Sequence, residues 1–508
     1  MSASAEEAAV AAADEEIVLQ NASRPIKIGP LTLPPWRSPI SQIILTGFVC
    51  FLCPGMFNAL SGMGGGGQLD SSVVSNANTA LYTTFAVFGF GAGTFLNYYG
   101  ARVTMAIGGF GYCVYSASLL CYNHTKNQGF VTFAGALLGI CAAFLWCAQG
   151  TVMMSYPTEN EKGRYIGLFW GIFNLGAVIG SCIPIGNNWN STENKAVNDG
   201  TYVGFLVLMI CGGILAFLLV PPNKIVRKDG TRVQRIRHPS ALDEFKGLYQ
   251  TLFSDPYIIL LFPFFWASNW FYTYQMNAYN LFMFNTRTRS FTGLWYWLAQ
   301  IVGSLAFGAF LDNQKLTRRN RAIAGWVILF VIVNVVWGGG LKPELQMARP
   351  PKGADVTKYF RGMDVYEPGF AGYCFLYVFY GLLDATWQTY AYWVMGALSN
   401  DPRKLAYFAG FYKGIQSAGA AVVWGMDTGR ASYRTLFGTS WGLCVAGMII
   451  AIPVIWMRVH DTEVTAEDFV HAGETAELDS AAQPAAEVAP TEMPVSEKEG
   501  HVMTERAA

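Results

Sequence analysis

Apolar residues fill long stretches of this chain, and polar residues gather between them. Between Pro39 and Met457 the pattern predicts twelve helical spans, each about 20 residues or longer, enough to cross about 30 Å of hydrocarbon. The spans cover residues 40–62, 75–97, 102–122, 129–154, 164–186, 200–220, 257–283, 291–311, 321–341, 369–397, 405–427 and 435–457. The sequence therefore predicts an all-α polytopic membrane protein whose first partner is the lipid bilayer.

The second half of this pattern repeats the first. Residues 165–177, YIGLFWGIFNLGA, align without gaps on residues 408–420, FAGFYKGIQSAGA, and three glycines coincide. Small residues at such spacings let helix backbones approach closely. We expect two six-helix pseudo-repeat lobes, residues 40–220 and 257–457, joined by a basic cytoplasmic linker over residues 221–256.

Composition narrows the class of protein further. The chain is 52% hydrophobic and 13% charged, about half the charge of a soluble protein. Its formal net charge is zero, so nothing favours nucleic acid as a partner. The ten cysteines fall within apolar stretches and the five histidines are scattered through loops and tails, so neither a cofactor nor a metal is expected.

The two ends differ from the apolar middle. Residues 1–39 are predicted to be a largely disordered tail that holds no cleavable signal peptide, and residues 458–508 an acidic, disordered tail. If both ends are cytoplasmic, 22 of the 34 Lys and Arg residues lie on that side and 11 on the other. The glycosylation patterns at Asn123 and Asn190 then both lie outside, which predicts a glycoprotein. The particular membrane, plasma membrane or endomembrane, stays open.

Residues 55–70, GMFNALSGMGGGGQLD, place five glycines within six positions after the first span. A phosphate-binding loop needs a preceding strand and a following Lys-Ser/Thr pair, and both are missing. Gly62 to Gly67 instead predict an unwound or sharply turned helix end, serving either close packing or a gating hinge.

A second motif follows the eighth span. The stretch GAFLDNQKLTRRNR begins at Gly308 and resembles the loop signature of the major facilitator superfamily, with Asp312 at a helix end and Arg318 and Arg319 at the cytoplasmic face. The first-half copy, GTFLNYYGAR, keeps Gly93 and Arg102 but has Asn97 where an acid is usual. This resemblance implies the major facilitator fold over residues 40–457.

The glycine-rich stretch is also similar to that of the fungal-type branch of the Unc-ninety-three-like family, as is the link YPTENEKGRY over residues 156–165. Animal relatives in this family are known as channel regulators and receptor-trafficking partners. The resemblance therefore implies a membrane-protein partner as an alternative to transport.

Charged residues at mid-membrane are costly and mark functional sites. Asp384 lies about fourteen residues into the tenth span and Lys413 about nine residues into the eleventh, which run in opposite directions. Tyr380, Asp384 and Gln388 share one helical stripe, and Lys413 and Gln416 share another. The two charges predict either a structural ion pair or a substrate or proton site.

The seventh span is unusually aromatic, because the stretch over residues 262–284 carries eleven aromatics in 23 positions. A polar stripe runs through it at Asn269, Thr273 and Asn277, and Gln300 lies in the eighth span. Asn58 in the first span is a further candidate. Such side chains either bind a small solute or join helices by hydrogen bonds.

Two functions compete on these observations. The first is a carrier that moves a small solute by alternating access between two lobes. The second is a non-transporting regulatory or trafficking partner of a channel or receptor, favoured by Asn97 in the altered first motif. An enzyme is not expected: the GTSWG pattern at residues 438–442 resembles a hydrolase elbow but lies at the start of a membrane helix.

Overall fold

The computed structural model describes residues 26–28, 31–157, 162–193, 195–227, 256–313, 315–352, 354–398 and 402–460, with a few single positions between 233 and 253. Most of the predicted N-terminal tail, the basic linker and the acidic C-terminal tail lie outside the described residues. Within the predicted tail 1–39, however, β1 (Ile26–Ile28) pairs antiparallel with β2 (Leu31–Leu33), a hairpin that the composition did not predict.

Helices lie at every range that the hydrophobic pattern predicted. In chain order they are α2 (Pro39–Cys50), η1 (Phe51–Gly55), α3 (Met56–Gly62), η2 (Gly65–Gly67), α4 (Ser71–Thr125), α5 (Gln128–Ser155), α6 (Lys162–Gly180), α7 (Cys182–Asn188), α8 (Asp199–Leu215), η4 (Ala216–Leu218), η5 (Pro222–Lys224), η6 (Pro256–Leu261), α10 (Phe262–Ala267), η7 (Thr273–Asn280), α11 (Leu281–Met283), α12 (Thr286–Leu311), α13 (Arg318–Glu344), η8 (Val356–Lys358), α14 (Phe370–Leu398), α15 (Pro402–Thr428), α16 (Tyr433–Ile450) and α17 (Ile452–Met457). Eight helical stretches of the described part are long and apolar enough to cross a membrane.

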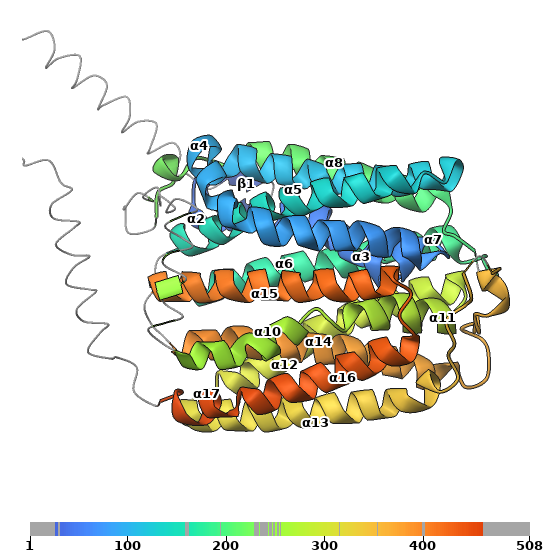
Figure 1. The fold of residues 1–508 in the computed structure, drawn as a ribbon. Helices are drawn as coiled ribbons and strands as arrows, with labels where there is room; N and C mark the ends of the chain where they lie inside the picture. Colours follow the sequence, from blue (N-terminus) through green and yellow to red (C-terminus); the bar gives the residue numbers. More distant parts are fainter. Residues whose placement is uncertain are drawn as a thin grey trace, which may run out of the picture. The chain divides into compact units, whose positions relative to one another are not determined.

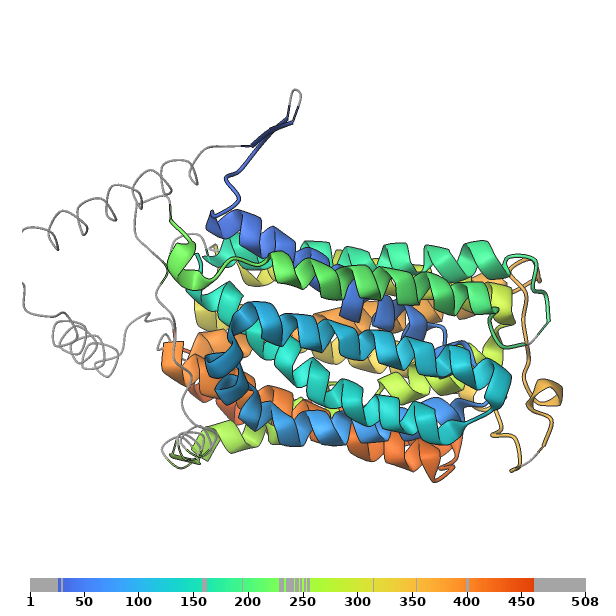
Figure 2. The same ribbon diagram turned by 90° about the horizontal axis from the view of Figure 1, so that it is seen from above.

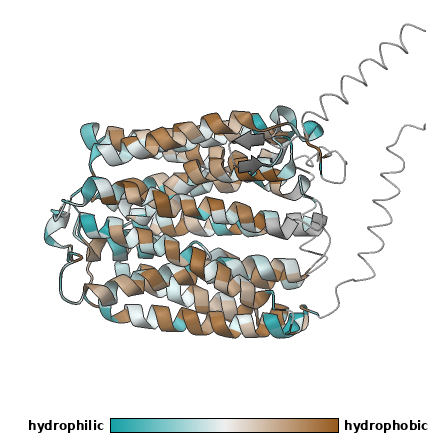
Figure 3. Cartoon of the chain, turned by 180° about the vertical axis from the view of Figure 1, so that it is seen from behind, coloured by the Kyte–Doolittle hydropathy of each residue, from teal (hydrophilic) through white to brown (hydrophobic). Residues whose placement is uncertain are grey.

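The predicted second and third spans form one helix, α4, interrupted at Gly100. Gly100 has φ +72°, a left-handed conformation that residues with a Cβ rarely adopt. The helices lie side by side (Figure 1), and apolar residues cover their lengths whereas polar residues concentrate toward their ends (Figure 3). This distribution matches a bundle whose middle lies in hydrocarbon.

Buried apolar residues form two clusters. The N-terminal cluster draws its members from Ile43 to Val233, and the C-terminal cluster draws all but Ala177 from Ile258 to Val459. We call these the N-terminal core and the C-terminal core. Figure 2 shows the same bundle from above.

Two glycines that coincide in the sequence repeat make equivalent contacts. A Cβ added at Gly176 in α6 would lie 2.5 Å from the carbonyl oxygen of Phe51, and a Cβ added at Gly419 in α15 would lie 2.5 Å from that of Trp266. Each glycine therefore lets its helix press on the backbone of the first helix of its own core.

One end of the bundle gathers α3, η2, α7, α11 and the loops around Lys126, Lys195, Arg349 and Arg430 (Figure 1). We call it the glycine end, because Gly62 to Gly67 lie there. Gly64 to Gly67 all have positive φ, so helix α3 ends and the chain turns sharply, as the sequence predicted.

Candidate functional site

The seventh span is broken near its middle. Helix α10 ends at Ala267, turns occupy residues 268–271, and η7 then continues as a π-helix. Such a break removes helical partners from nearby carbonyl groups, which need other donors in a membrane. The carbonyl oxygen of Ser268 accepts a 2.8 Å hydrogen bond from Gln388 Nε2 of α14.

The carboxylate of Asp384 lies beside this break and is completely buried. Its Oδ2 accepts hydrogen bonds from Tyr272 Oη at 2.8 Å and Gln300 Nε2 at 2.6 Å. Tyr296 Oη lies 3.4 Å away, and Gln388 Nε2 lies 3.3 Å from Oδ1. Neutral donors from three helical segments therefore hold this carboxylate.

A chain of neutral groups leads from Asp384 to Lys413. Gln388 Oε1 accepts hydrogen bonds from Tyr412 Oη and from Gln416 Nε2, the latter at 3.1 Å. Gln416 Nε2 also lies 3.0 Å from Asn269 Oδ1, and Gln416 Oε1 accepts from Lys413 Nζ at 2.9 Å. We call the connected side chains the central network: Asn269, Tyr272, Tyr296, Gln300, Asp384, Gln388, Tyr412, Lys413 and Gln416.

The predicted alternative of a direct ion pair between Asp384 and Lys413 is not formed. Ion pairs among the described residues include neither of them. Lys413 Nζ instead lies 5.6 Å and 5.3 Å from the ring centroids of Tyr392 and Tyr412. Both charges thus stay without an opposite charge at contact distance in the described part of the chain.

Four predicted residues do not join the central network: Tyr380, Thr273, Asn58 and Asn277. Tyr380 Oη approaches Gly340 of α13 and Thr273 Oγ1 is buried, and both lack a hydrogen-bond partner among the described residues. Asn58 lies half-buried on α3, outside the network. Of the predicted stripe, Asp384 and Gln388 join the central network, whereas Tyr380 packs toward α13.

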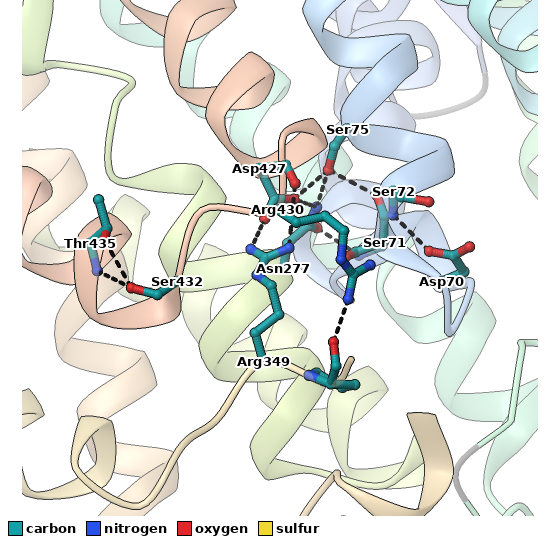
Figure 4. Close-up of polar contacts among 12 residues, drawn as sticks. Asp70, Ser71, Ser72, Ser75, Asn277, Arg349, Asp427, Arg430, Ser432 and Thr435 are labelled. Atoms are coloured by element: carbon teal, nitrogen blue, oxygen red, sulfur yellow. Dashed lines mark hydrogen bonds and ion pairs between the residues drawn. The ribbon is translucent and has the colours of Figure 1, made fainter. Parts of the chain in front are cut away.

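Asn277 belongs to a second cluster, at the glycine end. Asp427 of α15 accepts hydrogen bonds from Ser75 Oγ of α4 and, at 3.3 Å, from Asn277 Nδ2 (Figure 4). Arg349 forms an ion pair with the same carboxylate and donates to the carbonyl oxygen of Asp427 at 3.3 Å. This Asp427 cluster joins the two cores, because Ser75 lies among N-terminal-core helices.

The glycine turn makes further bonds between the cores. Gly65 N donates to Asn277 Oδ1 at 2.8 Å. The carbonyl oxygen of Gly62 accepts from Asn280 Nδ2 at 2.8 Å and from Tyr377 Oη at 2.7 Å. Side-chain amides of η7 thus bind the buried backbone groups of the turn.

A third set of contacts joins residues 189–197 to the start of α12. Arg287 N donates to Ser191 O at 3.2 Å, and Lys195 N donates to Thr286 Oγ1 at 3.0 Å. Arg287 also pairs with Asp364 at 2.5 Å. Partial burial of the Asp364 carboxyl is outweighed by hydrogen bonds from Arg287, Tyr366 N and Asn285, so its pKa is lowered.

Hydrogen bonds between the cores, where both partners are described, therefore gather at the glycine end. The loop-signature residues lie at the opposite end. Arg318 Nη2 donates to Gly396 O at 2.8 Å and Arg102 Nε to Leu219 O at 2.8 Å. Gly308 lies on α12 and Gly93 on α4, Asp312 follows the last residue of α12, and Arg319 is the second residue of α13.

The two predicted glycosylation positions differ in their surroundings. The amide of Asn123 lies in the last turns of α4 and bonds Asp199 at 2.9 Å and Gln68 at 2.8 Å. Asn190 lies in the loop after α7.

Sequence reasoning missed Tyr272, Tyr296 and Tyr412 in the central network and the whole Asp427 cluster except Asn277. The acid at position 427, at the end of an apolar helix, was a usable signal. Arg349 lies in a loop, where no periodicity indicates a partner.

Comparison with known proteins agrees with this architecture. A family model described as "Ion channel regulatory protein UNC-93" matches residues 75–426. The chain is 51% identical to an UNC93-like protein of Schizosaccharomyces pombe, over 85% of each chain. It is 43% identical to UNC93-like protein 1 of Arabidopsis thaliana, over 84% of this chain and 92% of the relative.

Among solved structures, the crystal structure of a D-xylose-proton symporter superposes on 83% of this chain and 99% of its own, with a TM-score of 0.59 at 9% identity. The predicted resemblance to the Unc-ninety-three-like family is thereby confirmed, together with a mainly helical fold like that of this symporter. The chain belongs to the UNC-93 family of membrane proteins and has the major facilitator fold.

Proposed function

We propose that this protein is a secondary carrier that moves a small solute across a membrane by alternating access between two six-helix lobes. The observation that carries the proposal is the central network, which keeps Asp384 and Lys413 in helices α14 and α15 without pairing them to each other. Unpaired charges at this depth are costly, and a transported solute supplies the missing partners.

The proposal requires twelve membrane crossings, four more than the eight apolar stretches of the described part. We assign the further crossings to the first part of α4, to the segment from η6 to α11, and to α14 and α15. These segments contribute Ser75, Asn277, Asp384 and Asp427, and their polar side chains lower their mean hydropathy. The matching contacts of Gly176 and Gly419 support the duplicated arrangement.

Bonds between the cores at the glycine end support a state closed on that side. We propose that the glycine end faces away from the cytoplasm, that both chain ends are cytoplasmic, and that opening breaks the Asp427 cluster and the contacts of the glycine turn. The broken seventh span resembles the discontinuous helices that form substrate sites in other secondary carriers.

The experiment uses purified protein in lipid vesicles loaded with a yeast metabolite extract, with exchange of external isotope-labelled extract followed by mass spectrometry. We expect at least one solute to exchange faster than in protein-free vesicles. Asp384→Asn and Lys413→Gln should abolish that exchange. Glu193→Gln, an exposed loop variant, should retain it.

The description of the matching family model favours a second function, the regulation of an ion channel. A regulatory partner would co-purify with another membrane protein in stoichiometric amounts. If that occurs and no solute exchanges, the carrier proposal fails.

A further inference from the structure

The acid of the central network has unused acceptor capacity. Asp384 Oδ1 has one contact among the described residues, at 3.3 Å from Gln388 Nε2, and that amide donates at 2.8 Å to Ser268 O. A carboxylate oxygen accepts about two hydrogen bonds. Oδ1 is therefore open to a further donor.

The base of the network has unused donors. An ammonium group carries three N–H donors, and Lys413 Nζ makes one hydrogen bond within the described part, to Gln416 Oε1. The rings of Tyr392 and Tyr412 stabilise the positive charge of Lys413 through their faces, and a ring face offers no lone pair to accept those N–H groups. Two N–H groups thus stay free for an acceptor.

We propose that the central network binds a small zwitterionic solute, with its ammonium group on Asp384 and its carboxylate on Lys413; this rests on the proposed carrier function. A cationic solute would compensate Asp384 and leave Lys413 unpaired, and an anionic solute would do the reverse. A zwitterion compensates both charges at once and adds no net charge to a membrane interior.

The network also has a means of admitting such a molecule. Gln388 and Gln416 join the acid to the base through a 3.1 Å bond between their amides, and both are neutral. A solute that carries opposite charges a few bonds apart can replace this bridge. Tyr82 of α4 packs against both cores, and the ring centroids of Trp170 and Tyr392 lie 6.3 Å apart, so the network adjoins the surface along which the cores meet.

A cavity at the glycine end repeats this combination of charges. Its volume is about 380 Å³, and both halves of the chain line it, with Asp70 and Lys126 on one side and Asp355 and Arg430 on the other. Arg430 follows Asp427 by three residues (Figure 4), so the cavity adjoins the Asp427 cluster. Two acids and two bases along the wall of this cavity suit a dipolar solute of zero net charge better than an ion.

The experiment measures the melting temperature of the purified full-length protein with three probes. They are leucine, its methyl ester, which keeps only the ammonium group, and N-acetylleucine, which keeps only the carboxylate; alanine and phenylalanine sets extend the series. We expect the free amino acid to bind at least tenfold more tightly than either derivative. Asp384→Asn should remove the preference over the N-acetyl form, and Lys413→Gln the preference over the ester.

Glu193→Gln and Lys342→Gln, both exposed, serve as controls and should bind as the parent does. Melting temperatures without probe separate misfolding from lost binding. The proposal is overturned if no free amino acid binds the parent, or if a derivative binds more tightly. If other solutes exchange in the vesicle experiment, the carrier proposal then still holds. If the amino acid binds but no solute exchanges, the carrier proposal fails and the proposed class of ligand holds.

Discussion

Replacing Gly64 with alanine should open the glycine end. Gly64 has φ +75°, and a Cβ there would lie 2.2 Å from the carbonyl oxygen of Met276 in the C-terminal core. With φ +75° and ψ 139°, Gly64 lies outside the left-handed helical region, in a conformation that costs a non-glycine residue on the order of 1–3 kcal/mol. Relieving the overlap adds about 1–3 kcal/mol to the cost of the substitution in the closed state, because the two cores must separate by roughly an ångström.

Gly65→Ala is the matched control. Gly65 has φ +55°, but its added Cβ would meet nothing closer than 3.5 Å, so an alanine there suffers a backbone strain of about 1–2 kcal/mol without the overlap. The two variants should therefore differ by about 1–3 kcal/mol, which is roughly a 5- to 150-fold difference in the open population.

The assay follows alkylation of Ser290→Cys by a membrane-impermeant maleimide, with mass spectrometry at that position. Ser290 is 1% exposed and faces Met63 across the cores. Gly64→Ala should raise the rate at least fivefold above that of Gly65→Ala. Equal rates in the two variants would refute the idea that the close approach at Gly64 keeps the glycine end shut.

Three further predictions follow from particular contacts. Gly176→Ala should lower the melting temperature, because the added Cβ overlaps Phe51 O and costs about 1–3 kcal/mol of stability. Gly171→Ala is the control and should not lower it, because a Cβ there meets no atom within 4 Å. Equal melting curves of the two variants would contradict the packing. Glycan mapping should find sugar on Asn190 and not on Asn123, whose amide is already bonded; the reverse occupancy would contradict the observed hydrogen bonds. The lowered pKa of Asp364 stabilises the fold above the ordinary Asp pKa of about 4, and this contribution is lost as the pH falls through the lower folded value. Asp364→Asn should make the melting temperature depend less on pH in that range. An unchanged pH dependence would contradict the pairing of Asp364 with Arg287.

The sequence predicted the helices well and pointed to part of the central network, because both depend on local pattern. Long apolar stretches predicted every helix of the bundle, though not the short 3₁₀ turns η5 and η8, and two mid-helix charges led to Asp384 and Lys413. Gln388, Gln416, Asn269 and Gln300 then proved to be their neighbours. Polar side chains isolated in apolar helices need hydrogen-bond partners within the protein, so their positions in the sequence indicated which side chains would lie close together.

The predicted residues that lie outside the central network do so for geometric reasons. Residues four apart on an α-helix differ by about 40° around the axis, so Tyr380 lies about 80° from Gln388 and packs toward α13. The stripe from Asn269 to Asn277 crosses the break at residues 268–271 and a π-helix, so its members reach different clusters. The partnership of Ser75 with Asp427 depends on tertiary packing between segments far apart in the chain, which hydropathy does not encode.

The most direct test of the carrier is a distance measurement at both ends of the bundle. Spin labels at Gln128 and Leu345 span the glycine end, and labels at Tyr98 and Leu316 span the opposite end; all four side chains are exposed. A carrier predicts two populations at each pair, with one distance lengthening as the other shortens when a transported solute is added. A single unchanged distance at both ends, with and without solute, would contradict alternating access.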